Sequence, residues 1–101
     1  MIDRCEAMTV IDVNSGSALA DGTHASAYLE TNLSACEKIA AQIRLRNLAG
    51  IILIDFIDME SEEDYKKVEK KMTEFLAADR RKTVIHGWTK LGIMEMTRKR
   101  T

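Results

Sequence analysis

Two segments rich in branched aliphatic residues stand out near the start and the middle of the chain. The first, residues 8–13, ends at the turn sequence of residues 14–16, which is typical of a strand that runs into a loop. The second, residues 51–56, begins with four consecutive aliphatic residues. A run without polar interruption predicts a strand that is buried on both faces.

The C-terminal part of the chain holds a third predicted strand, residues 83–88. Because side chains alternate along a strand, Val84, His86 and Trp88 are expected on one face of it. Residues 91–96 are apolar but few, and we predict a strand there as well.

The segment between the first two strands predicts a loop and then a helix. Residues 15–28 are rich in Ser, Ala and Gly, which is typical of a loop. Apolar residues then recur every three or four positions and predict a helix that runs to about position 47. Thr31 or Asn32 is expected as its N-cap, and Gly50 as the residue that ends it.

A second helix is predicted to begin after Ser61. The Ser61 hydroxyl is followed by three acidic residues, which combines a capping side chain with negative charge at the positive end of the helix dipole. Apolar residues from Tyr65 to Leu76 form one stripe of this helix, and its four lysines lie largely off that stripe.

Strands that alternate with amphipathic helices predict the fold class. The order strand–helix–strand–helix–strand indicates an α/β fold with a mainly parallel sheet and right-handed crossovers. A chain of 101 residues with 46% apolar composition has room for one core, so residues 1–101 are expected to form a single small domain. The longest apolar run, residues 51–54, is too short for a membrane span or a signal peptide.

Charge is distributed unevenly along the chain. Residues 1–60 carry four basic and nine acidic groups, whereas residues 61–101 carry eleven basic and seven acidic groups. Three adjacent basic residues, Arg80, Arg81 and Lys82, follow the second predicted helix and are candidates for contacts with phosphate groups. The alternative is a solvated charged surface without a partner.

The two cysteines do not indicate a metal site. Cys5 and Cys36 are too few and too far apart for zinc, so we expect no zinc ligands in this segment. Cys36 lies on the apolar stripe of the first predicted helix and is interpreted as a small core residue. This cysteine usage is typical of a reduced, cytoplasmic protein.

Two aspartates come late in the first two predicted strands and are the main candidates for chemistry. In open α/β sheets, sites collect at the carboxyl ends of the strands, where Asp12 and Asp55 are expected. If these strands are neighbours, both carboxylates can reach one hard cation, of which Mg²⁺ is the natural candidate. Asn14 would point to the same side and orient Asp12. The alternative is that both acids only cap the loops that follow.

Other polar and aromatic residues give weaker signals. His24 and His86 have no Cys or His at ligand spacing, so both are interpreted as structural. Phe75 and Trp88 are interpreted as core residues rather than as platforms for base stacking.

Five blocks of the sequence resemble a known family. Residues 6–16, Glu-Ala-Met-Thr-Val-Ile-Asp-Val-Asn-Ser-Gly, closely resemble a segment of the ribonuclease E/G family, and so do residues 31–33 and 43–59. Residues 79–83 and 91–101 resemble its later blocks, nearer to the ribonuclease G branch. These blocks follow one another in the expected order and extend over nearly the whole chain. The resemblance implies the DNase I-like catalytic subdomain of an endoribonuclease.

The resemblance also implies a mechanism. The family cleaves single-stranded RNA in rRNA processing and mRNA decay, and its two magnesium-binding aspartates fall on Asp12 and Asp55. Its assisting asparagine falls on Asn14. A cation held there, Mg²⁺ or Mn²⁺ in its place, would activate a water that attacks phosphorus and leaves 5′-phosphate and 3′-hydroxyl ends. The family's contact to an RNA 5′-monophosphate falls on Lys82, where the ribonuclease E branch has Arg. A point-charge contact is therefore expected at this position.

The family's further parts are not found in these 101 residues. Its members also carry an S1 RNA-binding domain, an RNase H-like region, a 5′-sensor region and a cysteine pair for an intersubunit zinc. We therefore expect the chain to be a piece of a larger cytoplasmic enzyme that is a homo-oligomer in its full-length form. Alone, it is expected to be inactive or weakly active.

Other readings remain open at this point. A haloacid-dehalogenase-like phosphatase would use Asp12 as a nucleophile, although Asp12-Val13-Asn14 departs from the expected Asp-x-Asp. A non-catalytic module for oligomerisation or RNA contact is also compatible with the basic C-terminal end and the apolar helix faces. Asp58, three residues past Asp55, is a further candidate for a supporting role behind the metal ligands.

Overall fold

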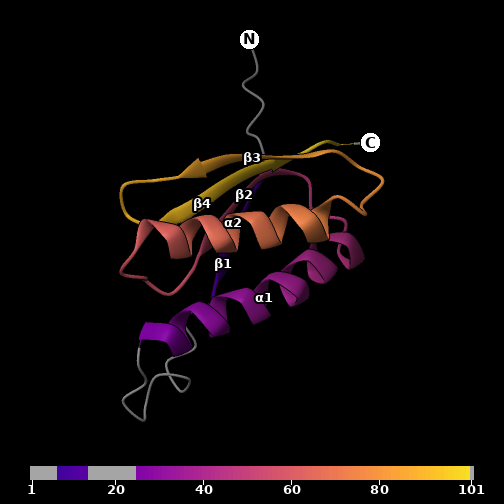
Figure 1. The fold of residues 1–101 in the computed structure, drawn as a ribbon. Coiled ribbons are helices and arrows are strands. Elements are labelled where there is room, and N and C mark those ends of the chain that lie inside the picture. The colour runs from indigo at the N-terminus through magenta and orange to yellow at the C-terminus, as the bar shows by residue number, and fades with distance from the viewer. Residues whose placement is uncertain (1–6, 14–24, 101) are drawn as a thin grey trace.

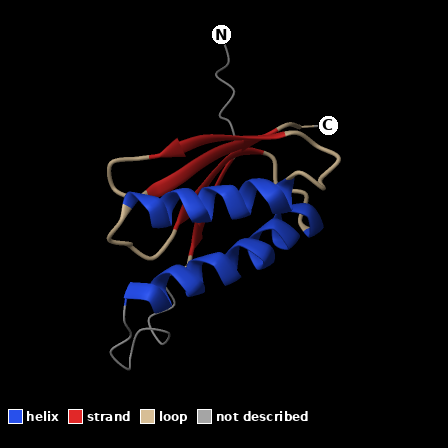
Figure 2. Ribbon diagram, in the orientation of Figure 1, coloured by secondary structure: helices blue, strands red, loops and turns tan. Residues whose placement is uncertain are grey.

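Strands and helices alternate along the chain until two consecutive strands end it (Figure 1). The computed structural model describes residues 7–13 and 25–100. In chain order the elements are β1 (Met8–Asp12), α1 (Ala25–Leu45), β2 (Gly50–Asp55), α2 (Glu62–Leu76), β3 (Thr83–Trp88) and β4 (Ile93–Arg98). Both helices lie on one face of the four-stranded sheet, as Figure 2 shows. The α/β class is confirmed, and the additional strand predicted over residues 91–96 is confirmed as β4.

The sheet is mixed, so the prediction of a mainly parallel sheet was wrong. Its strand order is β1-β2-β4-β3. Only β1 and β2 pair in parallel, while β4 pairs antiparallel with both β2 and β3. The first three strands along the chain do run in one direction, as expected. The short turn after β3 reverses the chain, and β4 then occupies the position between β2 and β3.

The core lies between the sheet and the helices. Ile52 and Ile54 of β2 are fully buried against the helices, but Ile51 and Leu53 on the opposite face are only partly buried. The prediction that this strand is buried on both faces was therefore wrong, because both helices cover the same face. The buried core residues of the other elements are Cys36, Ile39, Ala40 and Ile43 of α1, Val68, Met72 and Leu76 of α2, and Met94 and Met96 of β4.

Cys36 is a core residue, as predicted. Its side chain is fully buried, and burial raises the pKa of the thiol to about 12. The Sγ atom lies 3.3 Å from the carbonyl oxygen of Asn32, to which it donates. The thiol therefore stays protonated and unreactive at neutral pH.

Helix α1 begins at Ala25, six or seven residues before the expected N-cap at Thr31 or Asn32. Neither Thr31 nor Asn32 caps it, and residues 25–28 are helical rather than part of a loop; the rest of the predicted loop, residues 15–24, lies outside the described residues. Asn32 is fully buried inside the helix. Its Nδ2 donates to the carbonyl oxygen of Ile57 (2.8 Å), and its Oδ1 accepts from the Ile57 amide (3.0 Å). Because a distant backbone satisfies both polar groups, Asn32 has no need to cap a helix.

Asn47, rather than Gly50, ends α1. Asn47 adopts a positive φ of 54°, and the amide of Leu48 donates to the carbonyl of Ile43 across the helix end. This is the hydrogen-bond pattern of a Schellman motif. Gly50 is instead the first residue of β2, where its φ is +84° and a Cβ atom would lie 2.6 Å from the carbonyl oxygen of Ala7.

Helix α2 begins as predicted. The Ser61 hydroxyl accepts a hydrogen bond from the Asp64 amide at 3.2 Å, and three acidic residues occupy the first turn. Within residues 7–13 and 25–100, no helix is long and apolar enough to cross a membrane.

A β-bulge in β3 changes which face its last residue occupies. The pairing with β4 shifts between Ile85 and Gly87, and Gly87 has a φ of 123°. His86 lies on the open face, where it shares a hydrogen bond with the Thr97 hydroxyl. Trp88, expected on the same face as His86, instead lies on the helix side, where its ring packs against that of Tyr65. The extra residue of the bulge explains this reversal.

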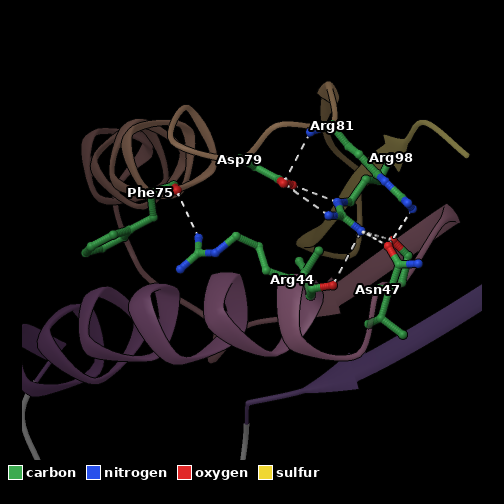
Figure 3. A network of polar contacts seen from close by, with 8 residues as sticks. Arg44, Asn47, Phe75, Asp79, Arg81 and Arg98 are labelled. Carbon is green, nitrogen blue, oxygen red and sulfur yellow. Dashed lines mark hydrogen bonds and ion pairs between the residues drawn. The ribbon is translucent and has the colours of Figure 1, made fainter. Parts of the chain in front are cut away.

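A buried ion pair joins the C-terminal ends of β4 and both helices (Figure 3). Arg98 is 4% exposed, and its Nε and Nη2 donate to the two carboxylate oxygens of Asp79 at 2.7 and 3.1 Å. Its Nη1 donates to the Leu48 carbonyl (2.7 Å) and to Asn47 Oδ1 (3.3 Å). One guanidinium therefore connects β4, the segment after α1 and the segment after α2.

We predict that Asn32→Ala destabilises the fold. The substitution leaves the Ile57 amide and carbonyl without their side-chain partner inside the protein, which costs about 3 kcal/mol. Urea unfolding followed by circular dichroism measures the loss, with Ser34→Ala on the exposed side of α1 as the control. Equal stability of the two variants would contradict the structural role of Asn32.

A second prediction concerns acid stability. The Arg98 guanidinium beside Asp79 holds the pKa of that carboxyl below its ordinary value, so the ion pair stabilises the fold at neutral pH. This contribution is lost as the pH falls below about 3.9 toward the lower pKa of the folded state. Asp79→Asn should cost about 3 kcal/mol at pH 7, and the difference from the unsubstituted protein should narrow in acid.

The control for this measurement is Glu74→Gln. Glu74 lies 3.7 Å from Lys71, and both side chains are about half exposed, so its loss should cost less than about 1 kcal/mol. Urea unfolding at several pH values between 2 and 7 separates the two variants. A constant difference for Asp79→Asn over that range would show that its charge does not stabilise the fold.

Candidate functional site

Asp12 and Asp55 lie side by side at the carboxyl ends of β1 and β2. The two strands are parallel neighbours, and Asp12 is the direct partner of Asp55 in their register. Neighbouring backbones in a sheet are about 4.8 Å apart, and directly paired residues point to the same face. Ile54 points into the core, so Asp55 and its partner lie on the face that the helices leave open. Asp12 and Asp55 are therefore neighbours in the sheet, as expected from the sequence.

The donor set at this edge fits a hard cation. Asp12 is exposed and Asp55 is partly buried, so both carboxylates remain within reach of water. No group of three or more Cys, His, Asp or Glu residues suited to a metal occurs in the part of the chain that the structure describes. Mg²⁺ keeps several water ligands and often takes only one or two carboxylates, which is what this pair offers. Asn14 lies outside the described residues, so its supporting role stays a prediction.

Asp58 lies beside the turn that joins β3 and β4. It is exposed, and a Cβ atom on Gly92 would be 3.4 Å from its Oδ1. Asp58 also lines a groove together with Tyr65 and Trp88. Its role in supporting the metal ligands stays a prediction. In the structure, the residues around Asp58 are those that line this groove.

The basic segment lies at the opposite edge of the sheet. Lys82 immediately precedes β3, whose first residue pairs with Arg98, and Arg98 in turn pairs with Gly50 at the start of β2. Five residues of strand separate Gly50 from Asp55, which corresponds to about 17 Å. The structure therefore does not bring the basic segment and the carboxylate pair together.

The three basic residues of this segment have different environments. Arg80 and Lys82 are exposed, whereas Arg81 is partly buried. The Arg81 guanidinium donates to Asn47 Oδ1, and its amide donates to Asp79. Lys82 lies next to Lys99, whose amide donates to the Lys82 carbonyl at 3.0 Å. Arg81 thus helps to hold the segment, while Arg80 and Lys82 can meet an anion.

A surface pocket of about 490 Å³ lies beside Lys82. Its basic lining residues are Lys82, Arg98, Lys99 and Arg100. Although Arg98 belongs to the basic C-terminal stretch of the sequence, its guanidinium is buried and paired with Asp79. The positive charge at the surface of this pocket therefore comes from Lys82, Lys99 and Arg100.

Sequence reasoning missed two charged residues on β4. Arg98 is the centre of the buried ion pair; its spacing from Met94 and Met96 puts it on their buried face, a signal that its charge and its basic neighbours hid. Glu95 lies on the open face and pairs with Leu53, which makes it a diagonal neighbour of Asp55 at about 7–8 Å. The alternation of Glu95 with the buried Met94 and Met96 could have revealed its position.

The predictions for the two histidines and for Cys5 have different outcomes. His86 is held by its hydrogen bond to Thr97, which is consistent with a structural residue. His24 and Cys5 lie outside the described residues, so their interpretations stay predictions.

Comparisons with known proteins agree with the sequence blocks. The chain matches the family model described as the ribonuclease E/G family over residues 1–101. It is 46% identical over 101 residues to ribonuclease G of Salmonella typhimurium and 45% identical to ribonuclease G of Haemophilus influenzae; each alignment covers the whole chain and 21% of the relative. It is 48% identical over 100 residues to ribonuclease E of Nostoc sp., where 99% of the chain covers 15% of the relative.

These matches establish the family to which the chain belongs. Because each match covers only a small part of the relative, it says little about the activity of a full-length protein. The chain spans about a fifth or less of the length of these relatives. Because the family model extends over every residue, however, the resemblance seen in the sequence blocks is confirmed. The chain belongs to the ribonuclease E/G family.

Proposed function

We propose that this chain is the metal-binding catalytic segment of an endoribonuclease that cleaves single-stranded RNA. The relatives are named ribonucleases G and E. The observation that carries the proposal is the pairing of Asp12 with Asp55 at one edge of the sheet. Two adjacent carboxylates on an open face are suited to hold a cation where a phosphodiester can approach.

Asp12 and Asp55 would hold Mg²⁺ or, in its place, Mn²⁺. When bound, the ion supplies charge neutralisation at the scissile phosphate and lowers the pKa of a water molecule. Asn14 would orient Asp12 through its amide. The reaction proposed is hydrolysis that leaves a 5′-phosphate on one product and a 3′-hydroxyl on the other.

Lys82 would bind a terminal 5′-phosphate of the same RNA, with Arg80 close by. The exposed ammonium of Lys82 acts as a point charge, so it provides attraction without the two parallel hydrogen bonds that Arg gives. Because the basic segment lies about 17 Å from Asp55 along β2, it would hold a phosphate well away from the cleaved bond.

The cellular setting belongs to the same proposal. The enzyme would act in the cytoplasm on rRNA precursors and mRNA, as a homo-oligomer of a longer chain in which this segment is the DNase I-like subdomain. A non-catalytic oligomerisation module is the second candidate. The exposed Met8, Val10 and Val84 on the open face favour it. Membership of the ribonuclease family lends no support to a haloacid-dehalogenase-like phosphatase.

We predict that Mn²⁺ binds at the paired aspartates. In a titration of the isotopically labelled chain, amide signals of residues 12, 13 and 55 should broaden selectively. Asp12→Asn and Asp55→Asn should each weaken binding by at least about tenfold, because each removes half of the carboxylate charge. Glu74→Gln, an exposed carboxylate on α2, is the control and should bind normally. Broadening centred on a part of the chain away from Asp12 and Asp55, or broadening unchanged by the aspartate variants, would contradict the proposed site.

A further prediction concerns cleavage. With Mg²⁺ present, the 101-residue chain should cut an end-labelled single-stranded RNA slowly or not at all, because it spans 21% of ribonuclease G and offers little surface to grip the strand. Gel analysis of products over time measures this. Efficient cutting that Asp12→Asn abolishes would show that these residues suffice for catalysis.

A further inference from the structure

A groove of about 770 Å³ opens at the same edge of the sheet as Asp12 and Asp55. It lies between the start of α2 and the turn that joins β3 and β4. Gly92 lines it, and the next residue, Ile93, pairs directly with Asp55. Standard strand and chain spacings place the Cα atom of Gly92 within about 9 Å of that of Asp55. The groove is therefore a direct neighbour of the proposed metal site.

Two aromatic rings line the groove and are held in fixed positions. The rings of Tyr65 and Trp88 meet edge to face, with centroids 4.8 Å apart and an interplanar angle of 79°. Trp88 Nε1 donates to Glu69 Oε1 at 3.1 Å, and the Tyr65 hydroxyl accepts from the Met59 amide at 3.1 Å. Phe56 supports Trp88, with a centroid distance of 5.6 Å. Both lining rings remain partly exposed, so they offer a preorganised apolar surface to a planar group.

The charges around the groove select against a phosphate. Asp58, Glu62 and Glu69 contribute three carboxylates, while Lys66 and Lys90 contribute two ammonium groups. This balance is net negative and repels an anion. Carboxylates are acceptors only, and they recognise amino groups such as N4 of cytosine. The lysines can donate to ring nitrogens and carbonyl oxygens of the same ligand.

We propose that this groove binds one base of single-stranded RNA and prefers a base with an exocyclic amino group (adenine, cytosine or guanine) over uracil. Trp88 packs against the core, as expected, but it stays partly exposed, so the base would lie against its ring, a role that the sequence did not suggest. The base would donate its amino hydrogens to Asp58 or Glu62, with its phosphates outside the groove. Stacking on an aromatic ring tolerates every base, so the preference comes from the carboxylates, which can accept from an amino group beside the ring but from uracil only at N3–H, between two carbonyl oxygens that repel them. This inference rests on the proposed ribonuclease function and adds a specificity subsite to it.

Trp88 is the only tryptophan of the chain, so its fluorescence reports directly on the groove. The 101-residue protein is titrated with hexanucleotides of adenylate, cytidylate and uridylate in the presence of EDTA. We expect saturable fluorescence changes, together with a shift of the Gly92 amide signal, and at least fivefold tighter binding of the first two than of oligouridylate. Equal affinities, or no change of either signal with any hexanucleotide, would overturn the proposal.

Variants test the source of the preference. The double substitution Asp58→Asn and Glu62→Gln should reduce the ratio of affinities to less than twofold, while Glu74→Gln, farther along α2, should leave it unchanged. Circular dichroism confirms that each variant is folded. A ratio retained by the folded double variant would overturn the assignment of the carboxylates.

The same titration separates this inference from the proposed function. Asp12→Asn should keep the preference, because the measurement is made without metal and Asp12 does not line the groove. Metal binding at the aspartates without base preference would overturn only the groove, and the reverse result would overturn only the metal site.

Discussion

The buried guanidinium of Arg98 is the constraint on which the arrangement of this sheet depends. A buried charge is costly unless it is paired and its donors are satisfied, and Arg98 meets this condition chiefly through Asp79, Leu48 and Asn47. These partners come from the segments that follow the two helices. Arg98 is also the last residue of β4, the strand inserted between β2 and β3. The ion pair therefore fixes the end of the inserted strand against both helix ends.

The position of β4 determines what lies at each edge of the sheet. With Arg98 opposite Gly50, the antiparallel register brings Ile93 opposite Asp55, so the turn before β4 reaches the edge that carries the two aspartates. The same register leaves Lys82 and Lys99 together at the other edge. The two aspartates and the adjacent Lys82 and Lys99 are thus separated by the length of the strands, although Lys66 and Lys90 line the groove at the aspartate edge.

Local pattern predicted much of this fold, and distant contacts explain the remainder. The first three strands and their common direction, the Ser61 cap and the proximity of Asp12 to Asp55 follow from periodicity, capping chemistry and the topology of α/β sheets. The insertion of β4 does not, because it depends on pairing with β2 some 40 residues earlier. The start of α1 was misplaced since Asn32 is satisfied by the backbone of Ile57, and the face of Trp88 was misplaced because a bulge intervenes.

Because side chains alternate along a strand, the two faces of the sheet differ chemically at the carboxyl ends of β1 and β2. Asp55 lies on the open face, whereas the residue after it, Phe56, is 2% exposed and packs against Trp88 on the helix side. A nucleotide has a comparable asymmetry, with a charged phosphate and a planar base on different sides of its sugar. In the proposed complex, a strand that crosses this edge presents phosphate to the carboxylate side and a base to the aromatic side. The one-residue alternation of a β-strand would thereby place bond cleavage and base selection next to each other.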